Sequence, residues 1–418
     1  MSYKTSKNCR ICNKKNIEKI FFLKPVPIGE KYYLKKINKK NKIKKYPFSV
    51  GFCKKCKNVQ TMEVVSDKHL WKDYTYFSSQ TKAIILHFEN ISNVIAKKIK
   101  LKKNELVLDI GSNDGSLLKN FKKQGCKVLG VDPAANVVKY ANSKGIKTIL
   151  GKLDPEMGKF IIKKKIKPKL ITAFNVFAHT PKLKEMLITI KKILSKDGHF
   201  VFEVQYLGDI LEKKILGTFF HEHMHHHSIN SLMNFFNLHN LNFYDVIKVN
   251  IQKGSIVGFV TNNMKIKKSK RFKNLLKIEN KKKYCSVKML IKFKNYINEC
   301  NLKIKKIIGK NNFKYIAGYG AARSGPNLIM NFGLKDKIKL LIDDHYMKKN
   351  KYSAFNSLQV LPPNILRKSK IDLCIILAYL HQKKIIKKNI SFIKAGLNFL
   401  SLFPKPQIIN KENFKKFI

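Results

Sequence analysis

The sequence predicts an α/β protein in which a small metal-dependent module precedes two domains built on parallel sheets. Two C-x-x-C pairs stand near the start of the chain. An apolar run at 107–110, with one acid, has the character of a buried parallel strand, and a glycine turn and an apolar-periodic helix follow it. A second strand, glycine turn and helix begin at Tyr315. The length agrees with this division, because 418 residues are too many for one hydrophobic core.

The four cysteines of the two pairs predict a structural zinc site. Cys9 and Cys12 are separated from Cys53 and Cys56 by 40 residues. Each pair can close on one side of the metal, and together the pairs offer four tetrahedral thiolate ligands. A redox motif would need only one pair. We therefore expect a zinc-binding module at 1–66, and we expect the other four cysteines, which lack this spacing, to be packed thiols.

An aromatic and hydroxyl cluster at 71–79 leads into a helix expected at about 81–100. Two interpretations of this cluster stay open. In one, it is a linker that packs its rings. In the other, Tyr74, Tyr76 and Ser78 line the entrance to a ligand-binding cleft.

The strand at 107–110 opens a doubly wound sheet. Gly111 and Gly115 bracket its turn, where the backbone can pass close to a ligand. A second strand at 128–132 ends in Asp132 about 20 residues later, the distance at which such a sheet places a carboxylate on a ribose. The turn lacks a full G-x-G-x-x-G, which argues against a dinucleotide. We expect the sheet to continue with strands at 170–174, 200–204, 243–249 and 255–261, the last two as an antiparallel pair.

Two histidine-containing segments follow strands of this sheet. Asn175 and His179 come after the strand at 170–174, at the carboxyl end where ligands bind in open α/β sheets. A histidine in this place can also be an ordinary packed residue. The segment 219–228 follows the strand at 200–204 by one helix and holds five of the chain's 12 histidines.

Three interpretations of the segment 219–228 remain open. Residues 221–225 match H-E-x-x-H, a zinc hydrolase motif when it lies on a helix, but a loop at the mouth of a sheet argues against that function. The run could instead be a casual metal-binding tract. In the third interpretation Glu222 and His223 are an acid/base pair, in which the carboxylate sets the tautomer and basicity of the imidazole.

The last third of the chain predicts a helical connector at 265–310 and a second α/β domain at 311–418. Apolar residues recur at helical spacing through the connector. In the second domain Gly318 and Gly320 form the turn, and Asp343 ends the next strand 23 residues after Gly320. Further strands are expected at 373–377 and 399–403. The expected ligand is a phosphate at the start of the helix, with Arg323 nearby.

The net charge of +60 invites a nucleic-acid or anionic-membrane interpretation. Nearly all of the excess is lysine spread along the chain, whereas proteins that read nucleic acids rely on arginine. We therefore expect a solvated basic surface that attracts anionic substrates and no nucleic-acid partner. A nucleic-acid-binding protein remains the alternative of another class. The start of the chain is polar and no apolar run reaches 18 residues, so we expect a cytoplasmic protein without a membrane span.

Asp109 and Asp132, at the ends of the first two strands, resemble class I S-adenosylmethionine-dependent methyltransferases. The whole chain resembles the sugar-nucleotide C-methyltransferases, which methylate C3 of 4-keto-deoxy sugars in antibiotic and surface-polysaccharide pathways. The segments that carry this resemblance are the paired C-x-x-C, the GSNDGS turn, the N-V-x-A-H segment, the H-E-H loop and the GYGA turn. The resemblance implies a zinc module, a class I seven-stranded sheet within 67–264 that binds S-adenosylmethionine, and a Rossmann-like domain at 311–418 that binds a sugar nucleotide.

The resemblance also implies roles for individual residues. The cofactor-binding candidates are Asp109, Gly111, Asn113, Asp114, Gly115, Asp132 and Asn175. The catalytic candidates are Tyr76, His179, Glu222 and His223, and the substrate-binding candidates are Gly318, Gly320, Arg323 and Asp343. In the implied reaction a base removes the C3 proton and the enolate takes the methyl group. His223 paired with Glu222 is the expected base, and His179 and Tyr76 are expected at the oxyanion. An O- or N-methyltransferase on the same scaffold is the alternative.

Three departures from the family pattern bear on the substrate more than on the reaction type. Phe220 stands where the family has tyrosine before H-E-H, which removes a hydroxyl. His226 and His227 replace a Tyr-Phe pair. The stretch 348–355 lacks the glycines and proline of the family's K-x-G-x-x-x-P-G. We expect a monomer or a small homo-oligomer.

Overall fold

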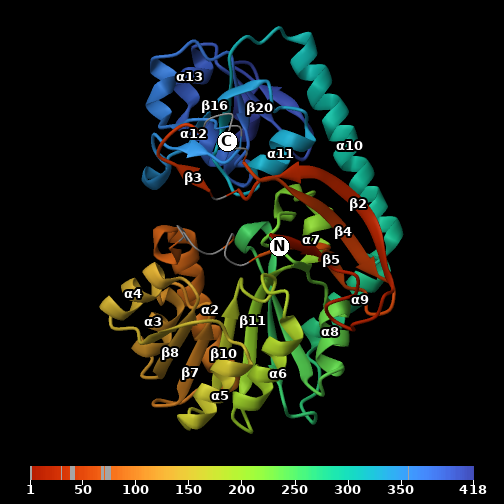
Figure 1. The fold of residues 1–418 in the computed structure, drawn as a ribbon, viewed down its shortest axis with the longest axis vertical. Helices are drawn as coiled ribbons and strands as arrows, with labels where there is room; N and C mark the ends of the chain where they lie inside the picture. The colour runs from red at the N-terminus through yellow and green to blue at the C-terminus, as the bar shows by residue number, and fades with distance from the viewer. Residues whose placement is uncertain (1, 30, 38–42, 67–69, 71–76, 356) are drawn as a thin grey trace.

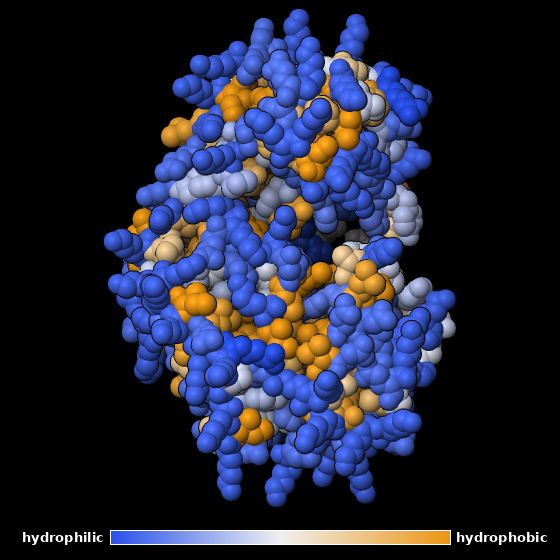
Figure 2. All heavy atoms as spheres, turned by 180° about the vertical axis from the view of Figure 1, so that it is seen from behind, coloured by the Kyte–Doolittle hydropathy of each residue, from blue (hydrophilic) through white to orange (hydrophobic). Residues whose placement is uncertain are grey.

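The computed structural model describes residues 2–29, 31–37, 43–66, 70, 77–355 and 357–418. Figure 1 shows two large α/β domains, one above the other, with the N-terminal strands beside their junction. The surface seen in Figure 2 is mostly hydrophilic, as expected for a chain with 86 lysines and arginines. Among the described helices, none is both long and apolar enough to cross a membrane.

The N-terminal module is built on a four-stranded antiparallel sheet that borrows its last strand from the middle of the chain. The strands are β2 (Ile17–Val26), β4 (Tyr46–Cys53), β5 (Val59–Thr61) and β12 (His225–His226), in the order β12-β5-β4-β2. Two further strands flank it: β1 (Tyr3–Thr5) pairs with β6 (Glu63–Val65), and β3 (Tyr32–Tyr33) pairs with β17 (Tyr352–Ser353). Strand pairing therefore joins this module to both large domains.

The middle domain contains the predicted doubly wound sheet. Its strands are β7 (Leu106–Ile110), β8 (Lys127–Asp132), β9 (Thr148–Leu150), β10 (Leu170–Phe174), β11 (His199–Gln205), β13 (Asn242–Val249) and β14 (Ser255–Thr261). They lie in the order β13-β14-β11-β10-β7-β8-β9. The five strands from β11 to β9 are parallel, and β14 is antiparallel to both β11 and β13. The predicted strands and the closing antiparallel pair are confirmed; β9 was not predicted.

Alternating burial explains why helices cover both faces of this sheet. Along β7, Leu108 and Ile110 belong to the core that includes α5 (Pro155–Lys163) and α6 (Leu183–Ile193). Val107 points to the other face, where α2 (Lys82–Ile99) and α3 (Ser116–Lys123) pack. Side chains alternate along a strand, so a continuous apolar run serves two cores. The other helices of this domain are α4 (Ala135–Ser143), α7 (Leu207–Glu212) and α8 (Ile229–Asn237).

A helical pair leads to the C-terminal domain. The helices are α9 (Lys270–Lys282) and α10 (Val287–Lys310), and α10 contacts β2, α7 and the last strand of the chain. The C-terminal sheet has the order β18-β16-β15-β19-β20-β21 and is parallel except for β21. Its strands are β15 (Ile316–Tyr319), β16 (Ile338–Ile342), β18 (Val360–Leu361), β19 (Leu373–Ile376), β20 (Asn398–Ser401) and β21 (Gln407–Ile409). Its helices are α11 (Gly325–Asn331), α12 (Gln382–Lys388) and α13 (Ile390–Lys394).

The four predicted zinc ligands meet at one point of the N-terminal module. Their sulfur atoms lie within 4.8 Å of one another, with 3.4 Å between the Sγ atoms of Cys9 and Cys56 and 3.6 Å between those of Cys12 and Cys53. A tetrahedron with metal–sulfur distances of about 2.3 Å has edges of about 3.8 Å. The cluster therefore fits one zinc ion.

We expect the purified protein to contain one equivalent of zinc, and we expect Cys56→Ser to lose it and to melt at a lower temperature. The metal links the two ends of a lysine-rich segment that has little core of its own, so ligand loss should destabilise the module. Elemental analysis and thermal melting check this. Cys126→Ser is the matched control, because Cys126 is a buried cysteine outside the cluster. A zinc-free protein that melts at the wild-type temperature would contradict the prediction.

Candidate active site

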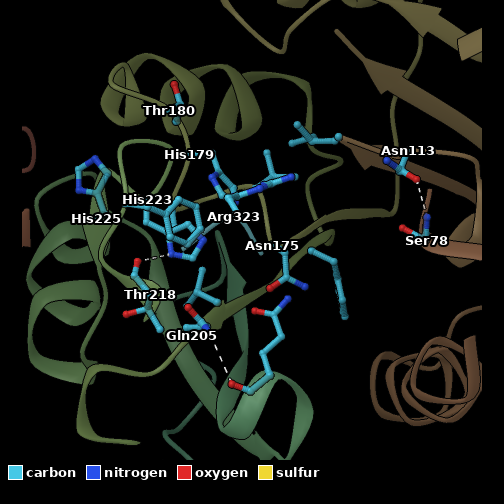
Figure 3. A pocket seen from close by; sticks show the side chains of 18 of the residues that line it. Ser78, Asn113, Asn175, His179, Thr180, Gln205, Thr218, His223, His225 and Arg323 are labelled. Carbon is cyan, nitrogen blue, oxygen red and sulfur yellow. Dashed lines mark hydrogen bonds between the residues drawn. The ribbon is translucent and has the colours of Figure 1, made fainter. Parts of the chain in front are cut away.

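One cavity of about 650 Å³ lies at the carboxyl ends of strands from both large sheets (Figure 3). Its wall includes residues at the ends of β7, β8, β10 and β11, and residues that follow β15 and β19 of the C-terminal domain. The carboxyl edge of an open parallel sheet is where ligands bind. A ligand in this cavity can therefore contact two such edges at once.

The glycine turn after β7 forms one end of the cavity. Gly111 has φ +64°, and a Cβ on it would lie 2.3 Å from Cγ2 of Val176, so both conformation and space require glycine here. The Gly111 N–H donates to Val131 O at 2.7 Å, which ties the turn to the end of β8. The next turn residues are thereby brought against Asp132.

Asp132 lies at the tip of β8 and is 5% exposed. Its Oδ2 accepts from the N–H of Asn113 and its Oδ1 from the N–H of Ala134, both at 2.9 Å. Burial raises the pKa of Asp132, and the two backbone donors partly offset that rise. A carboxylate oxygen has more than one lone pair, so each oxygen can still accept a hydroxyl. The residue thus stands where a doubly wound sheet binds a ribose.

The candidate cofactor residues fall into two groups. Gly111, Asn113, Asp132 and Asn175 line the cavity, whereas Asp109, Asp114 and Gly115 do not. Asp109 is buried and accepts from Thr172 Oγ1 at 2.6 Å, and burial raises its pKa to about 7.

Asp114 and Gly115 shape the turn from behind. Asp114 accepts from the N–H of Ser79 at 2.8 Å and from the N–H and hydroxyl of Ser116, at the start of α3. Gly115 has φ +77° and abuts Ile146. The Asn113 amide oxygen accepts from the N–H of Ser78 at 2.9 Å, and Ser78 lines the cavity. Tyr74 and Tyr76, from the same aromatic segment, lie outside the described residues.

His179 and His223 face each other with ring centroids 4.8 Å apart (Figure 3). The Nδ1 atom of His179 lies 2.8 Å from Glu222 O, and that of His223 lies 2.8 Å from Thr218 O. A carbonyl oxygen only accepts, so each Nδ1 carries the proton and each Nε2 presents a lone pair. Burial lowers the pKa of His179 to about 4 and that of His223 well below its ordinary value. Both imidazoles are therefore neutral at pH 7.

The predicted pairing of the Glu222 carboxylate with the His223 imidazole is wrong. The Nδ1 proton of His223 is already donated to a backbone carbonyl, that of Thr218. The carboxylate of Glu222 instead lies 3.9 Å from Nε of Arg323, which comes from the C-terminal domain. The guanidinium carbon of Arg323 is 6.0 Å from the centroid of the Phe220 ring, and that ring is 4.0 Å from the imidazole of His223. Glu222 thus orients Arg323 through its carboxylate and His179 through its backbone.

The remaining histidines of the segment 219–228 are structural. Residues 221–225 form a turn that runs into β12, which rules out the helical zinc-hydrolase motif. Among the described residues, the four cysteines are the only metal-ligand group of three or more, so the casual metal-binding interpretation is not supported either. His221 hydrogen-bonds to Pro47 O at 3.0 Å, and the ring of His225 stacks on that of His227 at 5.5 Å.

The C-terminal candidates divide in the same way as the cofactor candidates. Arg323 lines the cavity, whereas Gly318, Gly320 and Asp343 lie behind it. Asp343 accepts from the N–H of Ala321 at 2.7 Å, so it holds the turn that presents Arg323. Gly320 has φ +100°, and its Cα approaches the backbone of Ala378 too closely for a side chain.

Sequence reasoning missed several residues that complete the site. Gln205, at the end of β11, lines the cavity, and its position at a strand tip could have identified it. Tyr379 lines it from the C-terminal domain and accepts from the N–H of Gly217 at 2.7 Å. Glu203 lies behind the wall, where its carboxylate accepts from Asn175 Nδ2 at 2.9 Å and pairs with His87. A lone buried glutamate within a strand gives no sequence signal for that role.

Comparison with known proteins matches three family descriptions in succession along the chain. Residues 9–71 match "Putative zinc binding domain", residues 87–246 match "Methyltransferase domain", and residues 250–404 match "C-methyltransferase C-terminal domain". The C-methyltransferase NovU of Streptomyces niveus is 28% identical over 372 residues, which cover 88% of this chain and 89% of NovU.

Solved structures of methyltransferases resemble part of the chain. An S-adenosylmethionine-dependent methyltransferase from Clostridium acetobutylicum is 16% identical with a TM-score of 0.35, covering 42% of this chain and 91% of that one. The magnesium protoporphyrin IX methyltransferase of Synechocystis, with bound SAH, is 15% identical with a TM-score of 0.36, covering 46% and 90%.

The family matches agree with the structure in their order: the cysteine cluster, the seven-stranded sheet with its glycine turn and Asp132, and the domain that supplies Arg323. NovU aligns with most of its length to the same arrangement. The chain therefore belongs to the S-adenosylmethionine-dependent C-methyltransferases that carry an N-terminal zinc-binding domain.

Proposed function

We propose that this C-methyltransferase methylates C3 of a nucleotide-linked 4-keto-deoxy sugar by way of an enolate. The observation that supports this most directly is the state of His223. Its imidazole is neutral, its Nδ1 proton is held by Thr218, and the ring lines the same cavity as Asp132. A neutral imidazole with a free lone pair is a general base, and alkylation of carbon needs such a base.

His223 takes the proton from the carbon next to the ketone. The ketone acidifies that carbon, and Nε2 is the ring atom with the lone pair. As the imidazole becomes charged, the carbonyl of Thr218 stabilises it through the Nδ1 proton. Burial disfavours the charged ring, but the enolate forms beside it and offsets that cost. The base is thus kept unprotonated until a substrate supplies the counter-charge.

Arg323 is the group that we assign to the negative charge on the substrate oxygen. It is a permanent cation in the cavity wall, oriented by Glu222 and by the ring of Phe220. His179 has its proton on Nδ1, so its Nε2 accepts a hydrogen bond and does not donate one to an oxyanion. We therefore propose that His179 accepts from a substrate hydroxyl. The expected contribution of Tyr76 stays a proposal outside the described residues.

S-adenosylmethionine supplies a methyl group on a sulfonium centre. We propose that Asp132 and the Gly111 turn hold its ribose and that Asn175 lies beside it, at the end of β10. The sugar nucleotide would occupy the rest of the cavity, toward the ends of β15 and β19. Alignment of two reactants in one closed space accounts for much of the rate of a transfer between them.

We expect Asp132→Asn to weaken S-adenosylmethionine binding by about 2 kcal/mol, roughly 30-fold in Kd, because a charged acceptor for the ribose hydroxyls is lost. Titration calorimetry measures this. The matched control is Asp343→Asn, since Asp343 follows the second strand of the other sheet and also holds its turn. Equal affinity in Asp132→Asn and wild type, with a loss in Asp343→Asn, would place the cofactor on the C-terminal domain.

We expect His223→Ala to abolish turnover while S-adenosylmethionine affinity stays near the wild-type value. The decisive measurement is hydrogen exchange of 4-keto sugar nucleotides in deuterium oxide without the methyl donor, followed by NMR. The wild type should exchange the hydrogen next to the ketone and the variant should not. Exchange that survives in His223→Ala but fails in His179→Ala would reassign the base. No exchange in the wild type, with a methylated oxygen in the product, would favour the O-methyltransferase alternative.

The pH profile follows from the lowered pKa of His223. A base must be unprotonated, and a lowered pKa keeps it so as the pH falls through about 6.5, where an ordinary histidine gains its proton. We therefore expect kcat/KM to stay level through that range and to fall only in more acidic solution. An inflection near pH 6.5 that disappears in His223→Ala would show that the free imidazole titrates normally.

A further inference from the structure

We propose that Arg10 and Thr61 of the zinc-binding module are positioning residues for His223, so that the geometry of the cysteine cluster sets the place of the imidazole. This rests on the proposed role of His223 as the base. Arg10 lies between Cys9 and Cys12 in the first C-x-x-C pair. Its Nη1 donates to Thr61 O at 2.8 Å, and its Nη2 donates to Met224 O at 3.3 Å and also to Thr61 O. One guanidinium thus joins the metal site to the residue after His223.

Thr61 extends this connection to His223 itself. Its hydroxyl donates to His223 O at 2.7 Å, and its N–H donates to Met224 O at 3.1 Å. Thr61 is the last residue of β5, and β5 pairs with β12 through Gln60 and His225. The backbone after His223 is therefore held as an added strand of the module's sheet.

The position of Arg10 is in turn fixed by groups at the cysteine cluster. Its N–H donates to Gln60 Oε1 at 3.0 Å. Asn58 Nδ2 donates to the same oxygen at 3.0 Å and lies 3.7 Å from Sγ of Cys9. A planar guanidinium can serve two carbonyls at once, whereas a lysine ammonium cannot reproduce that fork. The path from the metal site to His223 therefore consists of directional bonds.

The second C-x-x-C pair shows that this arrangement is not a general property of such turns. Lys54 holds the same place after Cys53 as Arg10 holds after Cys9. Its Nζ pairs with Glu18 at 2.8 Å, and its side chain is 65% exposed. Lys54 thus lies on the surface and makes no contact of this kind with the loop that carries His223, which makes it the matched control.

The test uses the full chain as Arg10→Lys, Thr61→Val and the control Lys54→Met. Zinc content, melting temperature and S-adenosylmethionine affinity are measured for each, together with kcat and KM. The position of the imidazole is read by NMR of protein labelled with ¹⁵N-histidine, in which the His223 signals are those missing from His223→Gln. This readout needs neither substrate nor turnover.

We expect Arg10→Lys and Thr61→Val to keep their zinc and their cofactor affinity, and to lose about 10- to 100-fold in kcat with little change in KM, as for other groups that orient a reacting side chain. Their His223 signals should shift, and those of Lys54→Met should not. A combined variant should lose less than the product of the two single losses, because both residues act on one backbone segment.

Two results would overturn the proposal. One is wild-type kcat and unmoved His223 signals in both variants at full zinc occupancy. The other is a loss of kcat that only parallels a loss of zinc in Arg10→Lys, with Thr61→Val unaffected, since Arg10 would then serve the stability of the module alone. Failure of the proposed function is separable from both: if His223→Ala still exchanged substrate hydrogen, the base would be wrong, while the NMR signals would still report the positioning.

Discussion

The loop at 217–228 is the feature on which the site depends, because all three domains hold it. The zinc-binding module binds it through Thr61 and Arg10. The middle domain binds it where the N–H of Met224 donates to Ala178 O at 2.9 Å. The C-terminal domain binds it through Tyr379 and through the Asn327 amide, which donates to Phe219 O. The catalytic loop is therefore an interface, and its geometry requires that all three domains be in place.

Burial gives this loop its chemistry and also an electrostatic cost. Burial lowers the pKa of His221, His227 and the adjoining His179 to about 4 and that of His226 to about 3. Above pH 6.5 these rings are neutral in the folded and the unfolded chain, so they leave stability unchanged there. Below that pH the unfolded chain binds protons that the folded chain refuses. Each ring then destabilises the fold by about 1.4 kcal/mol per pH unit until its own lowered pKa is reached. The same desolvation that keeps a base unprotonated thus makes the loop sensitive to acid.

Local pattern carried most of the fold and only part of the site. The strands of the middle sheet were predictable because each is a short apolar run of 4–8 residues followed by turn residues, and Asp132 was predictable because strand tips meet at one edge. Sequence spacing does not say which side chain at a tip faces the ligand. Asp109 and Asp343 stand at tips but brace the turns from behind, whereas Gln205 faces the cavity.

Contacts between distant segments account for the rest. The pairing of β12 with β5 joins residues more than 160 positions apart, and no local period in either segment announces it. The acid/base pairing expected from the adjacency of Glu222 and His223 failed for a related reason. Adjacent side chains in a turn point to different partners, and here the partners are Arg323 from the C-terminal domain and the carbonyl of Thr218.

The zinc-binding module also holds the other charged group of the cavity. The hydroxyl of Tyr32 donates to Ala321 O at 2.7 Å, two residues before Arg323. A side chain on Gly29 would collide with the carbonyl oxygen of Arg323, since a Cβ there would lie 2.0 Å from it. The module therefore contacts the turn that presents Arg323 as closely as it contacts the loop that presents His223. These two groups belong to different domains, yet a proton acceptor and a cation that act on one substrate must keep a fixed separation. A module that is bonded to both segments supplies that fixed reference, and this explains why a metal site with no place in the cavity wall is part of a methyltransferase.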